Sequence, residues 1–247
     1  MEVLSKTTLL QWMILHSLSR EELDSETITS RIAEEFSLYT GTATLRTKVN
    51  NLLISLVAKH FASKFVYGRL QLYKITSKGK QALTLPIAKW KEAIHTQLTC
   101  LEKMLEACYK QKTLHGFLQP PYDQTKLLTQ SMHPKSVFSY LSLVELDQLS
   151  QESDSAKHYI SIVQLQRVIQ KRYGWSCSST TFITYITRLV EKGYLHLSFG
   201  SEQNGNKVRM VSIREDGRRA IEIYSVKAHG QIIETKCMLK EIQNIFA

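Results

Sequence analysis

Apolar residues recur every three or four positions over several stretches of the chain, which is the spacing of helices that bury one face. The clearest stretch is 178–193, where Phe182, Ile186 and Leu189 share one face and hydroxyl residues precede them. Gly193 follows the last apolar positions, and glycine readily adopts the left-handed conformation that ends many helices. The pattern therefore predicts a helix that stops sharply at Lys192-Gly193.

A different pattern follows this helix. Leu195 and Leu197 alternate with polar residues, and the stretch 207–213 alternates Val and Ile with Lys, Arg and Ser. Alternation with a period of two is typical of a strand with one buried face. The polar residues 200–206 separate the two stretches, so the sequence predicts a hairpin with a polar tip.

The same order of patterns occurs in the first half of the chain. Residues 56–61 (LVAKHF) align with residues 189–194 (LVEKGY) at an offset of 133, and residues 73–83 align with residues 211–221 at an offset of 138. The difference, 138 − 133 = 5, means that the second hairpin tip is longer by that many residues. Two matched blocks in the same order predict an internal repeat.

The first copy of the repeat has its helix at 44–60 and its hairpin at 61–75, with Tyr67-Gly68-Arg69 at the tip. Apolar residues at helical spacing predict the buried face of this helix, which consists of Leu45, Val49, Leu52, Leu53 and Leu56. Each half of the chain is therefore predicted to contain one helix followed by one hairpin.

Further apolar stripes predict the remaining helices. They lie at 9–18, 28–36, 87–112, 137–149, 159–173 and 218–245, the last with a break at Gly230. Residues 113–135 contain Gly116, Pro120-Pro121 and His133-Pro134, which favour a linker with at most one short helical turn. We therefore predict a first domain at 1–112, a linker at 113–135 and a second domain at 136–247.

The chain is basic, with a net charge of +10 and a pI near 9.4. The two halves contribute equally, because 16 Lys and Arg minus 11 Asp and Glu give +5 for residues 1–124 and again for residues 125–247. Basicity of this kind on two helix–hairpin units indicates a polyanionic partner, most simply DNA.

Other classes of protein have less support in the sequence. The four cysteines form no C-x-x-C pair and no cluster with histidine, so neither a zinc site nor another cofactor is expected. The motifs of nucleophilic and phosphate-transfer enzymes are missing, so we do not expect an enzyme. No apolar run approaches the roughly 18 residues of a membrane span, and the chain does not begin with a signal-peptide pattern. We expect a cytoplasmic protein without a membrane partner.

The junction motifs resemble those of winged helix–turn–helix regulators. LVEKGYL at 189–195 resembles the helix-to-wing junction of the MarR type, and VSIREDGR at 211–218 resembles the V-x-L-T-x-x-G segment that leaves the wing. The first half resembles the same superfamily, with a PadR-like long helix after its wing. The resemblance implies a mainly α protein with small β-hairpin wings (α+β), formed by two winged helix–turn–helix domains in tandem. It also implies a sequence-specific transcription regulator that binds double-stranded DNA, with both copies in one chain as a pseudo-dimer.

A winged helix that binds DNA places one helix in the major groove and holds phosphates with the flanking residues. In the first copy the candidate residues are Thr44, Arg46, Thr47, Lys48, Asn50 and Asn51 on the helix, with Lys64 and Arg69 on the wing. In the second copy they are Ser178, Ser179, Thr180, Thr181, Thr184, Tyr185 and Arg188 on the helix, with Lys207 and Arg209 on the wing. Arg46 and Arg188 are the best candidates for bonding guanine or phosphate.

The second copy departs from the MarR pattern at its wing tip. In MarR-type proteins an Asp-x-Arg motif at this tip contacts DNA, whereas here the tip reads Asn204-Gly205-Asn206-Lys207. The Asp is missing, and Lys207 stands near the Arg position. Cys177 precedes the second helix, where a helix dipole can lower a thiol pKa and permit redox sensing. The favoured interpretation of Cys177 is a small buried hydrophobic residue.

Two other functions are compatible with the same patterns. A plasmid or phage replication initiator with tandem winged helices is also basic, but it binds repeated sites at an origin. A winged-helix scaffold of a chromosome-segregation or polymerase complex binds protein, and its recognition helix would be apolar or acidic on the outside. Regulators of the resembling type normally bind as two-fold dimers, so two chains could also associate through 87–112 or through the C-terminal helix. The sequence assigns no small-molecule effector.

Overall fold

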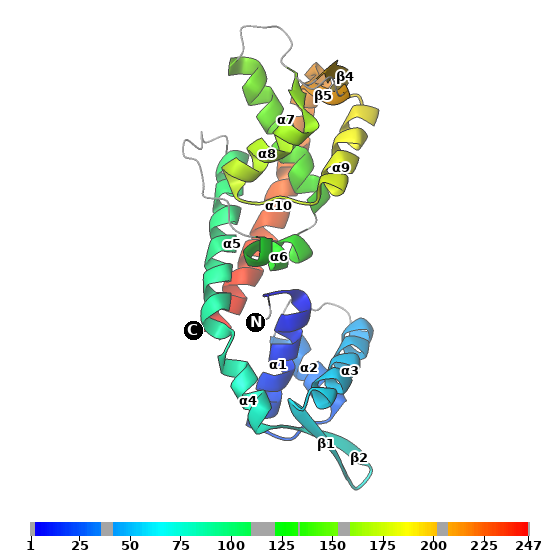
Figure 1. Ribbon diagram of the computed structural model, residues 1–247, viewed down its shortest axis with the longest axis vertical. Coiled ribbons are helices and arrows are strands. Elements are labelled where there is room, and N and C mark those ends of the chain that lie inside the picture. The colour runs from blue at the N-terminus through cyan, green and yellow to red at the C-terminus, as the bar shows by residue number, and fades with distance from the viewer. Residues whose placement is uncertain are drawn as a thin grey trace. The chain divides into compact units, whose positions relative to one another are not determined.

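The computed structural model describes residues 3–35, 42–109, 122–132, 134–152, 159–201 and 207–246. These residues are mainly helical, with two small antiparallel sheets (Figure 1). The chain forms two compact units, of which unit 1 comprises Met1–His95 with Met238–Ala247 and unit 2 comprises Thr96–Cys237. This division differs from the predicted one, because the long helix α5 (Ile87–Cys108) contributes to both units.

Unit 1 contains a group of helices followed by a two-stranded hairpin. Its elements in chain order are α1 (Lys6–Arg20), α2 (Ser25–Glu35), α3 (Thr42–Ala58), β1 (Ala62–Tyr67), β2 (Leu70–Ile75), α4 (Ser77–Thr84) and the first residues of α5. Asp24 begins α2, because its carboxylate accepts the backbone N–H groups of Glu26 and Thr27 at 2.8 and 2.9 Å. These contacts also lower the pKa of the Asp24 carboxyl, against the opposing effect of burial.

Buried apolar side chains from α1, α2 and α3 form the core of unit 1. The side chains of Ile14, Ile28 and Val49 are completely buried, one from each helix. Trp12 donates its indole N–H to the Leu83 carbonyl at 3.0 Å and meets Phe246 edge-on, with ring centroids 4.9 Å apart. The last residues of the chain therefore complete unit 1, although the sequence places them directly after unit 2.

Unit 2 repeats the order of helices and strands with additional helices around it. After the remaining residues of α5, its elements are α6 (Tyr122–Ser131), α7 (Pro134–Glu152), β3 (Ile160–Ser161), α8 (Ile162–Tyr173), α9 (Ser179–Glu191), β4 (Leu195–Ser201), β5 (Lys207–Ile213) and α10 (Glu215–Ile245), which continues into unit 1. The three strands form an antiparallel sheet with the order β3-β5-β4. In the core, Trp175 stacks on Phe138 at 4.3 Å between ring centroids.

Part of the predicted linker at 113–135 is helical. Residues Tyr122–Ser131 form α6, whose Leu127 and Leu128 are completely buried. Pro134 begins α7, since proline is favoured in the first turn, where its missing N–H has no helical partner. Residues 113–121 and 133 lie outside the described residues.

Two other boundaries differ from the sequence prediction. The helix predicted at 159–173 starts only at Ile162, because Ile160-Ser161 pair with β5 and the Ser161 hydroxyl then caps α8. The break predicted at Gly230 is wrong, because α10 continues through it. The buried residues Ala228 and Ile232 hold this part of α10 in place, and their packing offsets the roughly 1 kcal/mol that glycine costs in a helix.

The internal repeat is present in the backbone hydrogen bonds at the two helix-to-hairpin junctions. The His60 N–H donates to the Val57 carbonyl, and the corresponding Gly193 N–H donates to the Val190 carbonyl, both at 2.9 Å. The φ angles of His60 and Gly193 are 61° and 76°, so both residues are left-handed. The two helices therefore end in the same way, although only the second has glycine there.

The strand pairing repeats as well. In unit 1 Leu23 forms a single antiparallel bridge with Tyr73 of β2, and in unit 2 Ile160 of β3 pairs with Val211 of β5. Tyr73 and Val211 are separated by 211 − 73 = 138 positions, the offset found in the sequence alignment. Each hairpin thus receives a third chain segment on its second strand.

Two corresponding glycines lie against the junctions. A Cβ atom at Gly79 would approach the Phe61 carbonyl oxygen to 2.1 Å, and one at Gly217 would approach the Tyr194 carbonyl oxygen to 2.3 Å. Both carbonyls also accept a backbone N–H, from Thr76 at 3.1 Å and from Arg214 at 3.0 Å. Glycine is therefore needed at both positions so that the following helix can lie close to the junction.

Replacing either glycine with alanine is expected to destabilise its unit. Because the obstacle is a hydrogen-bonded backbone carbonyl, we expect Gly79→Ala and Gly217→Ala each to lower the free energy of unfolding by about 1–3 kcal/mol. Gly230→Ala is the control, because a Cβ there would meet nothing within 4 Å. This change should raise stability by about 0.5–1 kcal/mol. Urea titrations followed by circular dichroism measure all three, and equal effects at the three positions would contradict the packing described.

Candidate nucleic-acid interface

The outer face of α3 carries the residues predicted to contact DNA in unit 1. Leu45, Val49, Leu53 and Leu56 are buried as predicted, whereas Leu52 is only half-buried. The opposite face exposes Thr44, Arg46, Thr47, Lys48 and Asn51, and Asn50 is half-buried at its edge. The sequence therefore assigned the two faces of this helix correctly, with Leu52 and Asn50 at the boundary between them.

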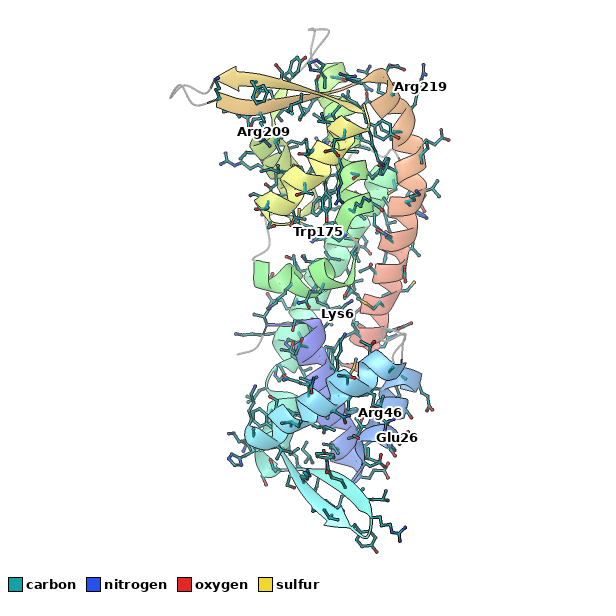
Figure 2. All side chains as sticks on the ribbon, turned by 90° about the vertical axis from the view of Figure 1, so that its right-hand side faces the viewer. Lys6, Glu26, Arg46, Trp175, Arg209 and Arg219 are labelled. Atoms are coloured by element: carbon teal, nitrogen blue, oxygen red, sulfur yellow. The ribbon has the colours of Figure 1, made fainter. Side chains whose placement is uncertain are left out.

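Arg46 and Thr47 already have partners within unit 1. The Arg46 guanidinium lies 3.7 Å from the Glu26 carboxylate on α2, and both side chains are more than half exposed (Figure 2). Exposed ion pairs of this kind contribute little free energy, so a phosphate could replace Glu26 at low cost. The Thr47 hydroxyl donates to the Ala43 carbonyl at 3.2 Å, which orients its oxygen on the helix surface.

Lys6, in the first turn of α1, adds a cation near this face that the sequence patterns did not indicate. Burial and then the nearby Lys48 cation lower the pKa of the Lys6 amine. A cation in the first turn of a helix is also unfavourable because of the helix dipole. Two lysine cations that repel each other beside an exposed helix are an arrangement that a bound anion would stabilise. Only the tertiary structure brings Lys6 and Lys48 together, since 42 positions (48 − 6) separate them in the sequence.

The hairpin of unit 1 presents cations beside exposed apolar side chains. Lys64 is exposed on β1, and Arg69 follows Gly68 in the two-residue turn between Tyr67 and Leu70. The side chains of Val66 and Tyr67 are 70% and 72% exposed. This apolar tip was not predicted, and alternation could not have revealed it, because Val66 and Tyr67 are neighbours that point to opposite faces of β1 and both are exposed.

In unit 2 the hydroxyl residues at the start of α9 serve the helix itself. Ser178 is the N-cap, since its hydroxyl accepts the Thr181 N–H at 3.3 Å and contacts the Thr181 hydroxyl at 2.7 Å. The Thr184 hydroxyl donates to the Thr180 carbonyl at 2.9 Å. Thr181 is half-buried, whereas the other four hydroxyl residues are exposed, namely Ser178, Ser179, Thr180 and Thr184. The Ser178 cap fixes the first turn of α9, and the exposed hydroxyl groups of the helix remain accessible to solvent.

Tyr185 and Arg188 line a pocket of about 90 Å³ at the other end of α9. Three cations contribute to its wall, namely Lys135, Arg188 and Lys192, together with the single carboxylate of Glu191. The Lys192 ammonium donates to the Tyr224 hydroxyl at 2.9 Å, and this bond raises the pKa of Lys192. Lys135 and Lys192 were not among the predicted site residues; Lys135 comes from α7 and approaches Arg188 only in the folded unit, whereas Lys192 lies one helical turn after Arg188.

The second hairpin resembles the first in its surface chemistry. Lys207 and Arg209 are exposed on β5, and Arg209 lies opposite Phe199 of β4. The Phe199 side chain is 68% exposed. The tip Asn204-Gly205-Asn206, where the Asp-x-Arg motif of the MarR type is missing, lies outside the described residues.

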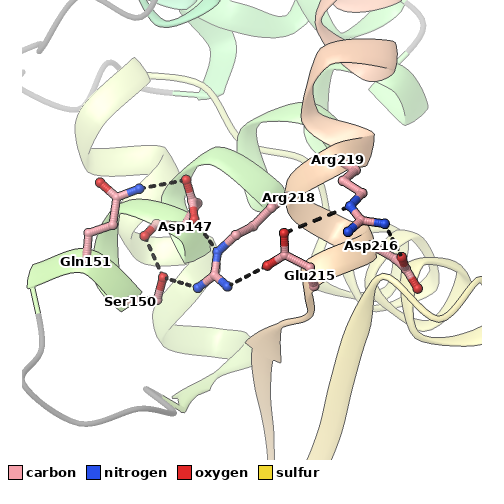
Figure 3. A network of polar contacts seen from close by, with 7 residues as sticks. All are labelled: Asp147, Ser150, Gln151, Glu215, Asp216, Arg218 and Arg219. Atoms are coloured by element: carbon pink, nitrogen blue, oxygen red, sulfur yellow. Dashed lines mark hydrogen bonds and ion pairs between the residues drawn. The ribbon is translucent and has the colours of Figure 1, made fainter.

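Arg218 and Arg219 follow the second hairpin but are engaged by carboxylates. Arg218 donates to Asp147 at 2.8 Å and to the Ser150 hydroxyl at 3.0 Å, and it also bonds Glu215 at 3.3 Å (Figure 3). Arg219 lies within 4.0 Å of Glu215 and Asp216. This network connects the start of α10 to the end of α7, so both arginines have a structural explanation.

Cys177 does not have the environment of a reactive thiol. Burial raises the pKa of its thiol to about 12, so it stays protonated near neutral pH. The dipole of α9 therefore does not outweigh the loss of solvent at this position. This supports the interpretation of Cys177 as a small packed residue.

The candidate residues form two groups, one on α3 with the first hairpin and one on α9 with the second.

Comparison with models of protein families and with curated proteins finds no match for the chain. Across the described residues, no helix combines the length and the apolar character needed to cross a membrane.

Proposed function

We propose that the protein is a sequence-specific transcription regulator that binds double-stranded DNA through two winged helix–turn–helix modules in one chain. The observation that carries this proposal is the repeated combination of an exposed helix face with arginine and a following hairpin with exposed cations. Arg46 with Lys64 and Arg69 forms the first combination, and Arg188 with Arg209 belongs to the second.

The order of elements supports the winged-helix assignment of each module. In unit 1 the order is helix, single bridge residue, two helices and hairpin, and in unit 2 it is helix, short strand, two helices and hairpin. In both, the early segment pairs with the second hairpin strand. Under this proposal α3 and α9 are the recognition helices, and the two hairpins are the wings.

The surface chemistry of each module fits a duplex. An α-helix fits the major groove, where arginine recognises guanine through two parallel hydrogen bonds. Hydroxyls and backbone N–H groups at the start of α9 suit phosphate oxygens. The exposed wing cations would contact the minor groove or its phosphates. The outer face of α3 is basic and polar around Arg46 and Lys48, which favours DNA over a protein partner.

The two recognition helices would read different base pairs. Arg46, Lys48 and Asn51 are exposed on α3, whereas α9 exposes mainly hydroxyls with Arg188 near its end. A homodimer reads a palindrome because its two faces are identical. One chain with two different faces has no such requirement, so we propose an asymmetric site.

Removing either arginine tests the assignment. Arg46→Ala and Arg188→Ala should each weaken binding to a recovered site by about 1–3 kcal/mol and relax preference at different base pairs. Arg219→Ala is the matched control, because Arg219 lies on α10, outside the proposed recognition helices and wings, and it should leave affinity nearly unchanged. Fluorescence anisotropy with labelled duplexes measures each affinity. Equal, small effects of all three substitutions would contradict the proposed roles.

A further inference from the structure

The hairpin of unit 1 carries an apolar cluster on one of its two faces. Side chains alternate between the faces of a strand, and directly paired residues share a face. The pairs Phe65–Leu72 and Tyr67–Leu70 therefore lie together on one face, which we call the outer face. Tyr67 and Leu70 are 72% and 56% exposed, and Phe65 and Leu72 are half-buried. These four side chains, next to the turn, form the apolar cluster.

The other face of the hairpin packs on its own unit. Ala62, Tyr73 and Ile75 belong to this face, and all three are buried. The hairpin continues beyond this contact, and its turn projects away from the helices of unit 1 (Figure 1). The apolar cluster therefore lies outside the core of unit 1, where a partner can reach it.

The second hairpin shows that the fold does not require this cluster. With the offsets of the repeat, the cluster corresponds to four residues without an aromatic ring, namely Ser198, Gly200, Val208 and Met210. A Cβ atom at Gly200 would lie 3.1 Å from the Met210 side chain, which covers the position that Tyr67 has in the first hairpin. Both hairpins form the same pairing, so the aromatic cluster of the first indicates a partner rather than a need of folding.

The charges of the first hairpin favour an anionic partner. Residues 62–75 contain three cations and neither Asp nor Glu. Lys74 pairs with Glu22 at 2.6 Å near the base of the hairpin, whereas Lys64 and Arg69 are exposed closer to its turn. Arg69 belongs to the two-residue turn itself. A cation thus lies within the apolar tip, which suits a partner that combines negative charge with an apolar interior.

We propose that the apolar cluster is a wedge that enters the minor groove of duplex DNA and partly unstacks one base step. This inference rests on the proposed function, in which the hairpin is the wing that follows the recognition helix α3. It goes beyond the contacts of the wing cations, because it assigns the apolar side chains and predicts a bend. Proteins that insert apolar side chains between base pairs kink the duplex toward the major groove.

Tyr67 and Leu70 are the side chains that enter the base step. They are directly paired, and both are more than half exposed beside the turn. Arg69 between them holds a phosphate at the wall of the groove. Phe65 and Leu72 continue the apolar surface behind the pair and face the opened groove. Pyrimidine–purine steps such as TA are the easiest to kink, so the wedge should prefer them.

The size of the cluster favours a base step over a protein partner. Its Cα positions span about 7 Å along the strands and about 5 Å across them. A stable protein interface buries roughly 800 Å² per partner, whereas a wedge needs only one or two side chains. A lipid surface also accepts cations beside apolar side chains, so lipid binding is a separate outcome of the experiment.

Ligase-catalysed circularisation of a duplex of about 120 bp that contains several TA steps tests the proposal. DNA shorter than its persistence length of about 150 bp resists closure, so a protein that bends it raises the yield of circles. At low salt the wild-type chain should raise this yield at least about 10-fold. Tyr67→Ser combined with Leu70→Ser should abolish the increase. The slope of log K against log salt should stay unchanged in this double variant, because no charge is removed.

Val66→Ser is the matched control for the double variant. Val66 is 70% exposed beside the turn, but it lies on the opposite face of β1 and pairs with Gln71. This variant should circularise DNA like the wild type, and so should Tyr67→Phe, which keeps the ring. Circular dichroism establishes that all variants fold. An equal loss of circles in Val66→Ser and in the double variant would overturn the role of the outer face.

Binding and bending are measured separately, so failure of the wedge differs from failure of the proposed function. Binding of the duplex by anisotropy without an increase in circles, or an undiminished increase in the double variant, would overturn the wedge alone. No binding to the duplex at low salt would overturn both. Vesicles of phosphatidylserine and phosphatidylcholine test the lipid alternative. Retention of the wild type but not of the double variant on them, without circularisation, would assign the cluster to a membrane surface instead.

Discussion

Replacing Glu145 with alanine is expected to lower the free energy of unfolding of unit 2 by about 3 kcal/mol. The Glu145 side chain is 1% exposed, and its carboxylate accepts hydrogen bonds from Tyr173 at 2.7 Å and from Arg172 at 2.9 Å. Alanine leaves the buried Tyr173 hydroxyl without this acceptor and creates a cavity. Both effects are costly in a close-packed interior.

Glu102→Ala is the matched control for this prediction. Glu102 also forms an ion pair in unit 2, with Lys236 at 3.1 Å, but its side chain is 55% exposed. Exposed pairs contribute about 0–1 kcal/mol, so this variant should unfold almost like the wild type. Thermal and urea unfolding measure both variants. Similar losses for Glu102→Ala and Glu145→Ala would show that burial of the Glu145 group is not the cause.

Glu145 also predicts a dependence of stability on pH. Burial raises the pKa of its carboxyl, and it outweighs the opposing effects of Arg172 and Tyr173. The folded state therefore holds this proton more tightly than the unfolded state does. The resulting stabilisation is complete below the usual glutamate pKa and is lost as pH rises through the raised value. Glu145→Gln, which titrates no proton, should remove this part of the pH dependence.

Affinity for duplex DNA should fall more than about 100-fold between 50 and 200 mM salt. The expectation rests on four exposed wing cations, namely Lys64, Arg69, Lys207 and Arg209. Each phosphate contact contributes about −0.9 to the slope of log K against log salt, so four contribute about −3.6. Contacts made by the helices would make the slope steeper.

Neutralising these cations one at a time with glutamine should reduce the slope by about 0.9 per residue. Lys89→Gln and Lys91→Gln are the controls, because they remove exposed charges from α5 rather than from a wing. Their slopes should equal that of the wild type. Anisotropy titrations at several salt concentrations provide the slopes. Equal reductions in the wing and α5 variants would mean that net charge alone, and not the wings, determines binding.

The repeated junctions could be predicted from sequence because their geometry demands particular residues. Gly79 and Gly217 each lie against a backbone carbonyl, and Gly193 has a left-handed backbone conformation. Glycine is favoured at all three positions, so its presence in the sequence indicates where the junctions lie. His60 adopts the same left-handed conformation without being glycine. The end of the first helix at His60 could be predicted only because the neighbouring residues align with those around Gly193.

The elements that sequence patterns misplaced depend on contacts between distant residues. Prolines and glycine suggested a linker at 113–135, yet Leu127 and Leu128 bury α6 in unit 2. A single glycine suggested a break in α10, but helix packing tolerates it. The end of the chain completes unit 1 through Phe246 and Trp12, a contact that no local pattern reveals.

The candidate site was only partly predictable for the same reason. Helical spacing identified the exposed faces of α3 and α9, because buried and exposed positions alternate with a fixed period. Lys6 and Lys135 come from other elements, and only folding places them beside predicted residues. Lys192 lies one helical turn after Arg188, so its place beside Arg188 could have been read from the sequence. The exposure of the apolar side chains of Tyr67 and Phe199 on the two hairpins was not predicted.

The central claim is that both modules read DNA, and recovery of bound fragments from sheared genomic DNA tests it most directly. Fragments retained by the wild-type protein at low salt, once sequenced, should share one asymmetric sequence. Arg46→Ala should lose preference in one part of that sequence, and Arg188→Ala should lose it in the other part. Fragments that cluster as repeats at one origin would indicate a replication initiator instead. No enrichment of any duplex at low salt would contradict DNA binding and favour a protein-binding scaffold.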